Sequence, residues 1–111
     1  LPSSSGEKEH ITDYISSLIY EAIYYSDGTL EGKVWSTNGI YGREDDNPTA
    51  IFYYLGDSVD EVGPVKNKAW YRNGKPHRDN DKPANIWYNK DGSVMKKSWY
   101  RNGKRYTPDK T

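Results

Sequence analysis

The residues best suited to chemistry in this sequence are aromatic rings that alternate with positively charged side chains. The pattern occurs twice, as Lys68, Trp70 and Arg72 and again as Lys97, Trp99 and Arg101. Residues two apart in a β-strand share a face. Such a face suits a single-stranded nucleic acid, because bases stack on rings and phosphates meet cations. Internal cation-π packing, in which charged side chains shield the rings, explains the same pattern better.

Each tryptophan of this pattern is followed directly by a tyrosine, in the pairs Trp70-Tyr71 and Trp99-Tyr100. Neighbours in a strand point to opposite faces, so one ring of each pair must face away from a single core. An outward ring is either covered by a second layer or available to a partner. The candidate binding residues are Lys68, Trp70, Tyr71, Arg72, His77, Arg78, Trp87, Lys97, Trp99, Tyr100, Arg101 and Arg105.

Catalytic and metal-binding chemistry find little support in the sequence. His10 and His77 are the only histidines, and there is no cysteine. Neither histidine has the spacing from an acid, a nucleophile or a second ligand that a triad or metal site requires. The acidic segments 44–47 and 79–81 resemble the start of a calcium loop but lack its glycine and closing glutamate. We therefore expect no enzyme, no metal and no other cofactor, with His77 in a structural hydrogen bond.

These residues belong to a sequence that repeats itself. The hexapeptide at residues 70–75 returns unchanged at 99–104, and a degenerate copy lies at 34–39. A second block repeats at residues 43–53 and 78–88. Self-similarity on this scale is typical of proteins in which each copy is one supersecondary unit stacked on the next. About three copies are expected, named here the first, second and third copy after Trp35, Trp70 and Trp99.

Turn residues divide each copy into short strands. Asn-Gly and Asp-Gly pairs favour type I′ turns, and the runs between them are rich in aromatic and β-branched residues. The expected strands are residues 29–35, 49–55, 68–72, 84–89, 93–101 and 104–107. The proline-ended segments 45–48 and 79–83 must turn a corner, because proline cannot pair in a ladder. The predicted fold is mainly β, an antiparallel β-hairpin repeat meander of about three repeats with a short N-terminal helix.

The N-terminal segment differs from the copies. Asp13 is a suitable helix cap, and the apolar residues after it follow the spacing of one helical face. The alternative is a further strand at residues 14–20, from a decayed copy. The expected organisation is a disordered or trimmed segment at 1–10, a capping helix at 11–21, a β-hairpin repeat domain at 22–107 and a tail at 108–111.

Composition limits both the core and the location of the protein. Only 17 of 111 residues are Leu, Ile, Val or Phe, whereas 11 are Tyr and 4 are Trp, so the core should be thin and aromatic. Residues 1–60 carry 3 basic and 11 acidic side chains, and residues 61–111 carry 13 and 5. Opposite charges and open strand edges favour weak head-to-tail self-association. With no cysteine, membrane span or signal peptide, the cytoplasm is the expected location.

The pattern Trp-Tyr-x-Asn-Gly-Lys-x-His-Arg at residues 70–78 is followed by acidic residues, Pro-Ala-x-Ile-x-Tyr and Asp-Gly. It resembles the short tandem repeats of uncharacterised bacteriophage and giant-virus proteins, which are similar in turn to MORN-type hairpin repeats. The likeness covers residues 22–107, but Tyr41-Gly42 lacks the histidine and the last copy ends early at 105–108. The resemblance implies stacked β-hairpins that form an interaction module, and it brings no catalytic residues.

A weaker similarity links residues 87–100 to choline-binding repeats, although their Thr-Gly-Trp element is missing here. That similarity implies aromatic cages that bind a cation.

We expect a non-catalytic protein-interaction module that binds another protein through the basic, aromatic region 68–105. The resemblance implies a viral or phage accessory protein acting in the cytoplasm of a host cell. One alternative is a single-stranded nucleic-acid-binding module that uses the same face. The other is a choline or cell-wall-binding repeat. No membrane partner is expected.

Overall fold

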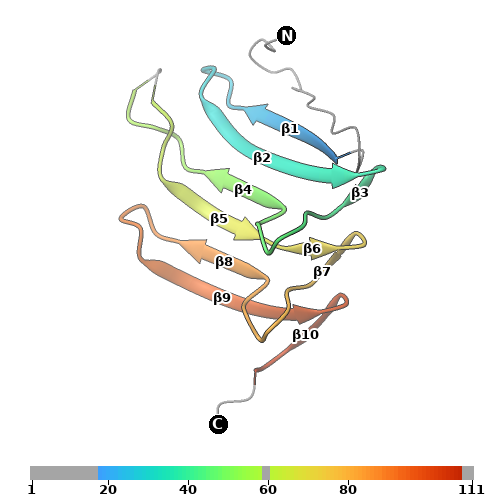
Figure 1. The fold of residues 1–111 in the computed structure, drawn as a ribbon. Helices are drawn as coiled ribbons and strands as arrows, with labels where there is room; N and C mark the ends of the chain where they lie inside the picture. The colour runs from blue at the N-terminus through green and yellow to red at the C-terminus, as the bar shows by residue number, and fades with distance from the viewer. Residues whose placement is uncertain (1–17, 59–60, 109–111) are drawn as a thin grey trace.

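This computed structural model describes residues 18–58 and 61–108 of the chain. These residues contain ten β-strands joined by turns and loops. Eight strands form one antiparallel sheet in the order β1-β2-β4-β5-β8-β9-β10, with β3 paired to β2, and β6 pairs with β7 beside it (Figure 1). The strands are β1 (Leu18–Tyr24), β2 (Leu30–Thr37), β3 (Ile40–Tyr41), β4 (Ala50–Tyr53), β5 (Val65–Ala69), β6 (Tyr71–Arg72), β7 (Lys75–Pro76), β8 (Asn85–Tyr88), β9 (Val94–Arg101) and β10 (Lys104–Tyr106). The predicted mainly β, antiparallel meander is confirmed.

The N-terminal helix needs a correction. Residues 18–21, the last part of the helix predicted at 11–21, belong to β1, and residues 11–17 lie outside the described residues. Pairing with β2 gives this segment a backbone ladder and a contact between the rings of Tyr20 and Trp35, whose centroids are 5.3 Å apart. Cross-strand contacts of this kind outweigh a helical spacing of apolar residues. The described sheet therefore includes residues 18–21, which precede the domain start predicted at residue 22.

The three Asn-Gly turns have the predicted geometry. Asn38, Asn73 and Asn102 have φ angles of 52°, 52° and 49°, and the glycine after each also has a positive φ. Two consecutive left-handed residues define the type I′ turn, whose twist matches that of its strands. These turns form three tips that follow one another along one side of the sheet in Figure 1.

The two Asp-Gly turns differ from the prediction. Gly28 and Gly92 have positive φ, but Asp27 and Asp91 do not, so a type I′ turn is the wrong assignment here. In the first of these turns, Asp27 Oδ1 accepts hydrogen bonds from the backbone N–H and the hydroxyl of Thr29, at 3.0 and 2.7 Å. The Asp27 side chain thus stabilises this turn, which has no second left-handed residue.

The sheet is a single layer. Its Cα atoms span 47 × 38 × 18 Å, and the radius of gyration is 15.2 Å, against roughly 13 Å for a compact domain of this length. Among the described residues there is no second layer on either face and no helix that could cross a membrane. The buried apolar residues are Ala22, Ala50, Ala69, Trp70 and Ala84. Hydrogen-bonded ladders and contacts between neighbouring hairpins therefore supply much of the stability that a thick core supplies elsewhere.

Strand order follows chain order, which keeps the two charged halves of the sequence apart. The acidic half forms β1 to β4 and the basic half forms β5 to β10, at opposite ends of the sheet (Figure 1). The electrostatic field at one end therefore differs from that at the other.

Candidate functional site

Trp70 joins the second copy to the first. It lies where the chain leaves β5 and enters β6, and only 6% of its surface is exposed. The guanidinium of Arg78 is 3.6 Å from the ring centroid, and the indole Nε1 donates to the backbone oxygen of Asp46 at 3.0 Å. The left-handed backbone of the corner, where Asp46 has a φ of 56°, presents this oxygen to the ring. Trp70 is therefore an internal contact.

Parts of this arrangement recur in the other copies. The guanidinium of Arg43 lies 3.7 Å from the centroid of Trp35, and Trp99 Nε1 donates to the backbone oxygen of Asp81 at 2.9 Å. Arg43 and Arg78 also donate to the carbonyl of the corner proline five residues later, at 3.2 and 3.0 Å. Burial lowers the pKa of the Arg43 guanidinium. In both copies the arginine covers its own tryptophan.

The carboxylate of Asp46 pairs with cations of the second copy. Arg78 Nε is 3.0 Å from Oδ1, and Lys82 Nζ is 3.0 Å from Oδ2. The hydrogen bond from Arg78, followed by that from Lys82, holds the pKa of Asp46 below its ordinary value. Arg78 therefore pairs with the preceding corner and not with Asp79 or Asp81, its neighbours in the sequence.

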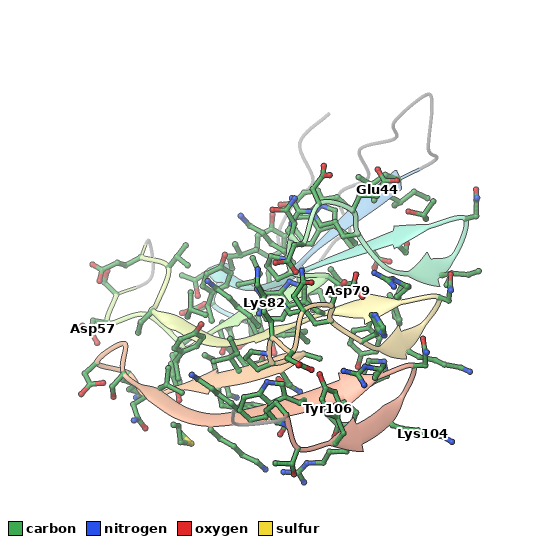
Figure 2. The ribbon with its side chains drawn as sticks, turned by 60° about the horizontal axis from the view of Figure 1, so that its bottom comes forward. Glu44, Asp57, Asp79, Lys82, Lys104 and Tyr106 are labelled. Atoms are coloured by element: carbon green, nitrogen blue, oxygen red, sulfur yellow. The ribbon has the colours of Figure 1, made fainter. Side chains whose placement is uncertain are left out.

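Asp81 has the same role one layer further along. Its Oδ1 accepts hydrogen bonds from Arg101 and from the hydroxyl of Tyr106, both at 2.9 Å. The Arg101 guanidinium is also 4.3 Å from the centroid of the Tyr106 ring. Desolvation and the hydrogen bond to Asp81 raise the pKa of Tyr106. Figure 2 shows Glu44, Asp79 and Tyr106 one below another down the stack of corners and hairpins.

His77 joins the second copy to the third. The ring is buried, and its Nδ1 accepts the backbone N–H of Asn102 at 3.0 Å. Nε2 must then carry the proton of the neutral ring, and it donates to Asp79 Oδ1 at 2.8 Å. Arg72 pairs with the same carboxylate. The hydrogen bond from His77, followed by that from Arg72, lowers the pKa of Asp79.

An open groove of 820 Å³ separates the tips of the first two hairpins. Its walls come from β3, from the corner 44–46 and from the β6–β7 hairpin, and Gly42 and Asn73 face it. Tyr41 is 51% exposed and meets Tyr71 edge to face, with their ring centroids 6.1 Å apart. This volume lies within the range of ligand sites in proteins, about 300–1,000 Å³.

One face of the sheet carries a row in which lysines alternate with isoleucines. The register pairs, in order along successive strands, Lys33, Ile51, Lys68, Ile86 and Lys97. Adjacent strands are ~4.8 Å apart, so the lysines recur every ~10 Å. Lys68 Nζ lies 5.8 Å from the ring centroid of Tyr88. This row brings Lys68 and Lys97, two of the predicted binding residues, to one face.

The opposite face carries the rings of Phe52 and Trp87. The register places Gly32, Phe52, Asn67, Trp87 and Lys96 in one row. A groove of 320 Å³ on this face is lined by Phe52, Trp87 and Tyr71, among others.

The outer side of β9 is an open strand edge. Ser98 accepts a hydrogen bond from the N–H of Ala84, so its polar groups point toward β8. Alternation along an antiparallel strand then directs the N–H and C=O of Lys97 away from β8. β10 pairs only with residues 99–101, and no described strand pairs with residues 94–98 on that side. Val94 and Met95 in this stretch are 48% and 58% exposed.

The twelve predicted binding residues do not form one surface. Six of them make side-chain hydrogen bonds or ion pairs within or between the copies: Trp70, Arg72, His77, Arg78, Trp99 and Arg101. Three are half-buried: Tyr71 and Tyr100, the tyrosines of the two Trp-Tyr pairs, and Trp87 in β8. Lys68 and Lys97 share the lysine row, and Arg105 is exposed on β10.

The predicted face of Lys68, Trp70 and Arg72 is interrupted. β5 ends at Ala69, and Arg72 lies in the separate β6–β7 ladder, so these three residues do not belong to one strand. Lys97, Trp99 and Arg101 do lie together in β9. The β6–β7 hairpin forms a ladder of its own, which short-range alternation does not reveal.

Sequence reasoning missed three residues that organise these contacts: Arg43, Asp46 and Asp81. The signal was present, because the blocks 43–53 and 78–88 repeat the arginine and the second aspartate at the same spacing. Local sequence patterns assigned these aspartates to turns. Their hydrogen-bond partners Trp70, Arg78 and Arg101 lie 20 to 32 residues away in the sequence.

Comparisons of this chain with protein-family models, with curated proteins and with solved structures found no match. The fold and contacts above define it as a single-layer antiparallel β protein with stacked hairpins.

We expect the free energy of unfolding to fall as the pH drops below about 4. The pKa values of Asp27, Asp46, Asp79 and Asp91 are lowered in the folded state. The unfolded chain therefore takes up protons first, and this stabilisation is lost as the pH drops through the folded-state values. Thermal unfolding followed by circular dichroism at each pH measures the effect.

The variants Asp46→Asn and Asp79→Asn should reduce the slope of stability against pH below pH 4. Asp57→Asn, on an exposed loop, is the control and should leave the slope unchanged. A melting temperature that stays level from pH 5 to pH 2 would contradict the assignment.

Proposed function

We propose that the chain is a non-catalytic protein-interaction module, built as an array of three structural repeats. It binds an extended segment of a partner protein at the outer edge of β9. The observation that carries this proposal is the unpaired stretch 94–98, which lies at the position where earlier strands receive a neighbour. The viral or phage setting implied by the sequence resemblance is part of the same proposal.

The earlier copies supply the precedent for an added strand. β2 pairs with β4 through residues 32–34, and β5 pairs with β8 through residues 67–69. The matching stretch of β9 is 96–98, whose other side already pairs with β8. A strand that adds to such an edge gains main-chain hydrogen bonds, while alternate side chains give specificity.

The rows of the sheet indicate which side chains suit the added strand. Ile51 and Ile86 lie opposite lysines, and Phe52 and Trp87 lie next to them in the facing strands. A partner strand should therefore place an aliphatic residue opposite Lys97 and an aromatic residue beside it. Acidic flanking residues are favoured, since β9 lies in the basic half of the sheet.

Binding of single-stranded nucleic acid is a second candidate, supported by the lysine row of Lys33, Lys68 and Lys97. The contacts of the arginines favour a protein partner instead. Arg78 covers Trp70 and pairs with Asp46, and Arg101 pairs with Asp81. A ring covered by a guanidinium does not offer that face to a base, and a paired arginine contributes less attraction to phosphates.

The test of the proposed function uses a capped peptide with the sequence of residues 83–90, which includes β8. We expect it to bind and to shift the amide signals of residues 94–98 in two-dimensional NMR. Lys97→Pro should weaken binding at least tenfold, because proline removes the outward N–H. It should leave the pairing with β8 intact, whereas Lys97→Ala, the control, should bind within about threefold of wild type.

Two results would count against this function. One is no shift of residues 94–98 at millimolar peptide, and the other is equal binding by Lys97→Pro and Lys97→Ala. An oligonucleotide that binds at ~50 mM salt and weakens steeply with added salt would favour the nucleic-acid candidate. Dimerisation of the chain that Lys97→Pro abolishes would identify a second copy as the occupant of the edge.

A further inference from the structure

The groove between the first two hairpin tips lacks a side chain that the next layer has. In the next layer, the imidazole of His77 lies between the Asn102 backbone N–H and the carboxylate of Asp79. The first copy has Gly42 at the matching place and Glu44 at that of the carboxylate. The groove of 820 Å³ contains both of these residues.

The two layers stack in the same way, so the comparison between them is direct. Gly74 N–H donates to the carbonyl of Tyr41 at 3.0 Å, and Gly103 N–H donates to that of Pro76 at 2.9 Å. Tyr41 and Pro76 are the residues just before Gly42 and His77. Asn73, which precedes Gly74, therefore corresponds to the asparagine whose N–H binds the imidazole.

Two groups in the groove could bind an imidazole, the Asn73 N–H and the Glu44 carboxylate, and space for the ring lies beside Gly42. A Cβ atom built on Gly42 would lie 3.9 Å from Asn73 N and 3.5 Å from the carbonyl oxygen of Tyr71, which are ordinary contact distances. No acceptor among the described residues bonds to Asn73 N–H, whereas the equivalent N–H of Asn102 has one. Similarly, no described cation pairs with the carboxylate of Glu44.

We propose that this groove binds the imidazole of a histidine carried by a partner protein. One ring nitrogen accepts the N–H of Asn73, and the other donates to Glu44, as His77 does within the chain. This site is separate from the edge of β9 and does not depend on it.

The surroundings of the groove favour a histidine within a basic segment over a free small molecule. The groove is far larger than one ring, so residues on either side of the histidine have room to lie along it. The corner at its wall carries Glu44 and Asp45, whose carboxylates pair with no described cation. The arginines that also line the groove, Arg43, Arg72 and Arg78, are held by Trp35, Asp79 and Asp46. Lysine or arginine next to the histidine would therefore meet the unpaired carboxylates of the corner.

The experiment uses the whole chain and three probes, each added separately: acetyl-Lys-His-Lys-amide, acetyl-Lys-Ala-Lys-amide and imidazole. We expect the histidine peptide to shift the Asn73 amide signal in two-dimensional NMR at neutral pH, with millimolar affinity for so small a probe. The alanine peptide should leave that signal in place, and imidazole should bind more weakly than the histidine peptide. Equal shifts with the two peptides, no shift with either, or imidazole binding as tightly as the histidine peptide would each overturn the proposal.

Substitutions at Gly42 supply a matched pair. Gly42→His should place its own ring against Asn73 N–H, move that amide signal toward the position of Asn102 and abolish the response to the histidine peptide. Gly42→Ala leaves most of the groove open and should keep the response. A response that persists in Gly42→His places the ring elsewhere and overturns the proposal.

Glu44→Ala keeps the proposal testable if Gly42→His fails to fold. It should weaken binding of the histidine peptide about fivefold, because a charge-assisted hydrogen bond is lost. Glu61→Ala, on an exposed loop, is the control and should bind like wild type. Equal binding by both variants would overturn the role of Glu44.

Discussion

Trp70→Ala is expected to lower the free energy of unfolding by about 3–5 kcal/mol, the largest effect of any single substitution considered for this chain. Trp70 is the one aromatic ring among the buried apolar residues of the described chain. Its removal opens a cavity between two copies and leaves the guanidinium of Arg78 without the ring it covers. The Asp46 carbonyl also loses its donor. Urea denaturation followed by circular dichroism measures the change.

Two further variants separate the causes of this effect. Trp70→Phe keeps a ring but loses the Nε1–H bond, and it should cost about 1–2 kcal/mol. Trp99→Ala removes the corresponding ring of the third copy, which is half-buried and which no described guanidinium covers, and it should cost about 1–2 kcal/mol. If Trp99→Ala destabilised the chain as much as Trp70→Ala, burial under the arginine would not be the cause.

Gly32→Val is expected to lower the free energy of unfolding by about 2–3 kcal/mol, although valine favours strands. Gly32 is buried in β2 and has an ordinary strand φ, so backbone strain is not the reason. A Cβ atom at this position would lie 2.5 Å and 2.7 Å from ring atoms of Phe52, and 3.1 Å from the backbone oxygen of Ile51. The Phe52 ring occupies the space above the glycine and would have to move.

The steric explanation predicts a coupling between the two positions. In Gly32→Val with Phe52→Ala, the valine occupies space that the ring has left, so the loss should be smaller than the sum of the two single variants by at least about 1 kcal/mol. Lys96→Val, at the exposed matching position of β9, is the control and should change stability by less than about 0.5 kcal/mol. Additive losses would exclude the clash as the cause.

Local sequence signals predicted the three Asn-Gly turns and the strands β2, β4, β8, β9 and β10. They did not predict β1, β3 or β7, and the strand expected at 68–72 is divided between β5 and β6. An Asn-Gly pair needs only its own φ preferences to form a type I′ turn, and all three pairs formed one. The Asp-Gly pairs failed this prediction because Asp27 bonds to Thr29 with its side chain, an alternative that the dipeptide alone does not exclude. The helix at 11–21 failed for residues 18–21 because their partners lie in β2, which the local spacing of apolar residues does not describe.

The sites were less predictable than the strands. The alternation of Lys68, Trp70 and Arg72 suggested one binding face, but the chain leaves the sheet after Ala69 and Arg72 pairs with Asp79. The open edge of β9 and the groove at Gly42 depend on which strand or hairpin lies next to which. Neither depends on the properties of a short segment alone.

The sequence by itself determined the Asn-Gly hairpins and the charge difference between the two halves, because each follows from residue type and local spacing. Only the tertiary structure decided which contacts the charged and aromatic side chains make. Stacking of the hairpins brings Asp46 to Trp70 and His77 to Asn102. Cations, rings and the buried imidazole therefore form contacts between the copies. The same stacking leaves the outer side of β9 and the groove at Gly42 unfilled, because no described strand or side chain occupies them.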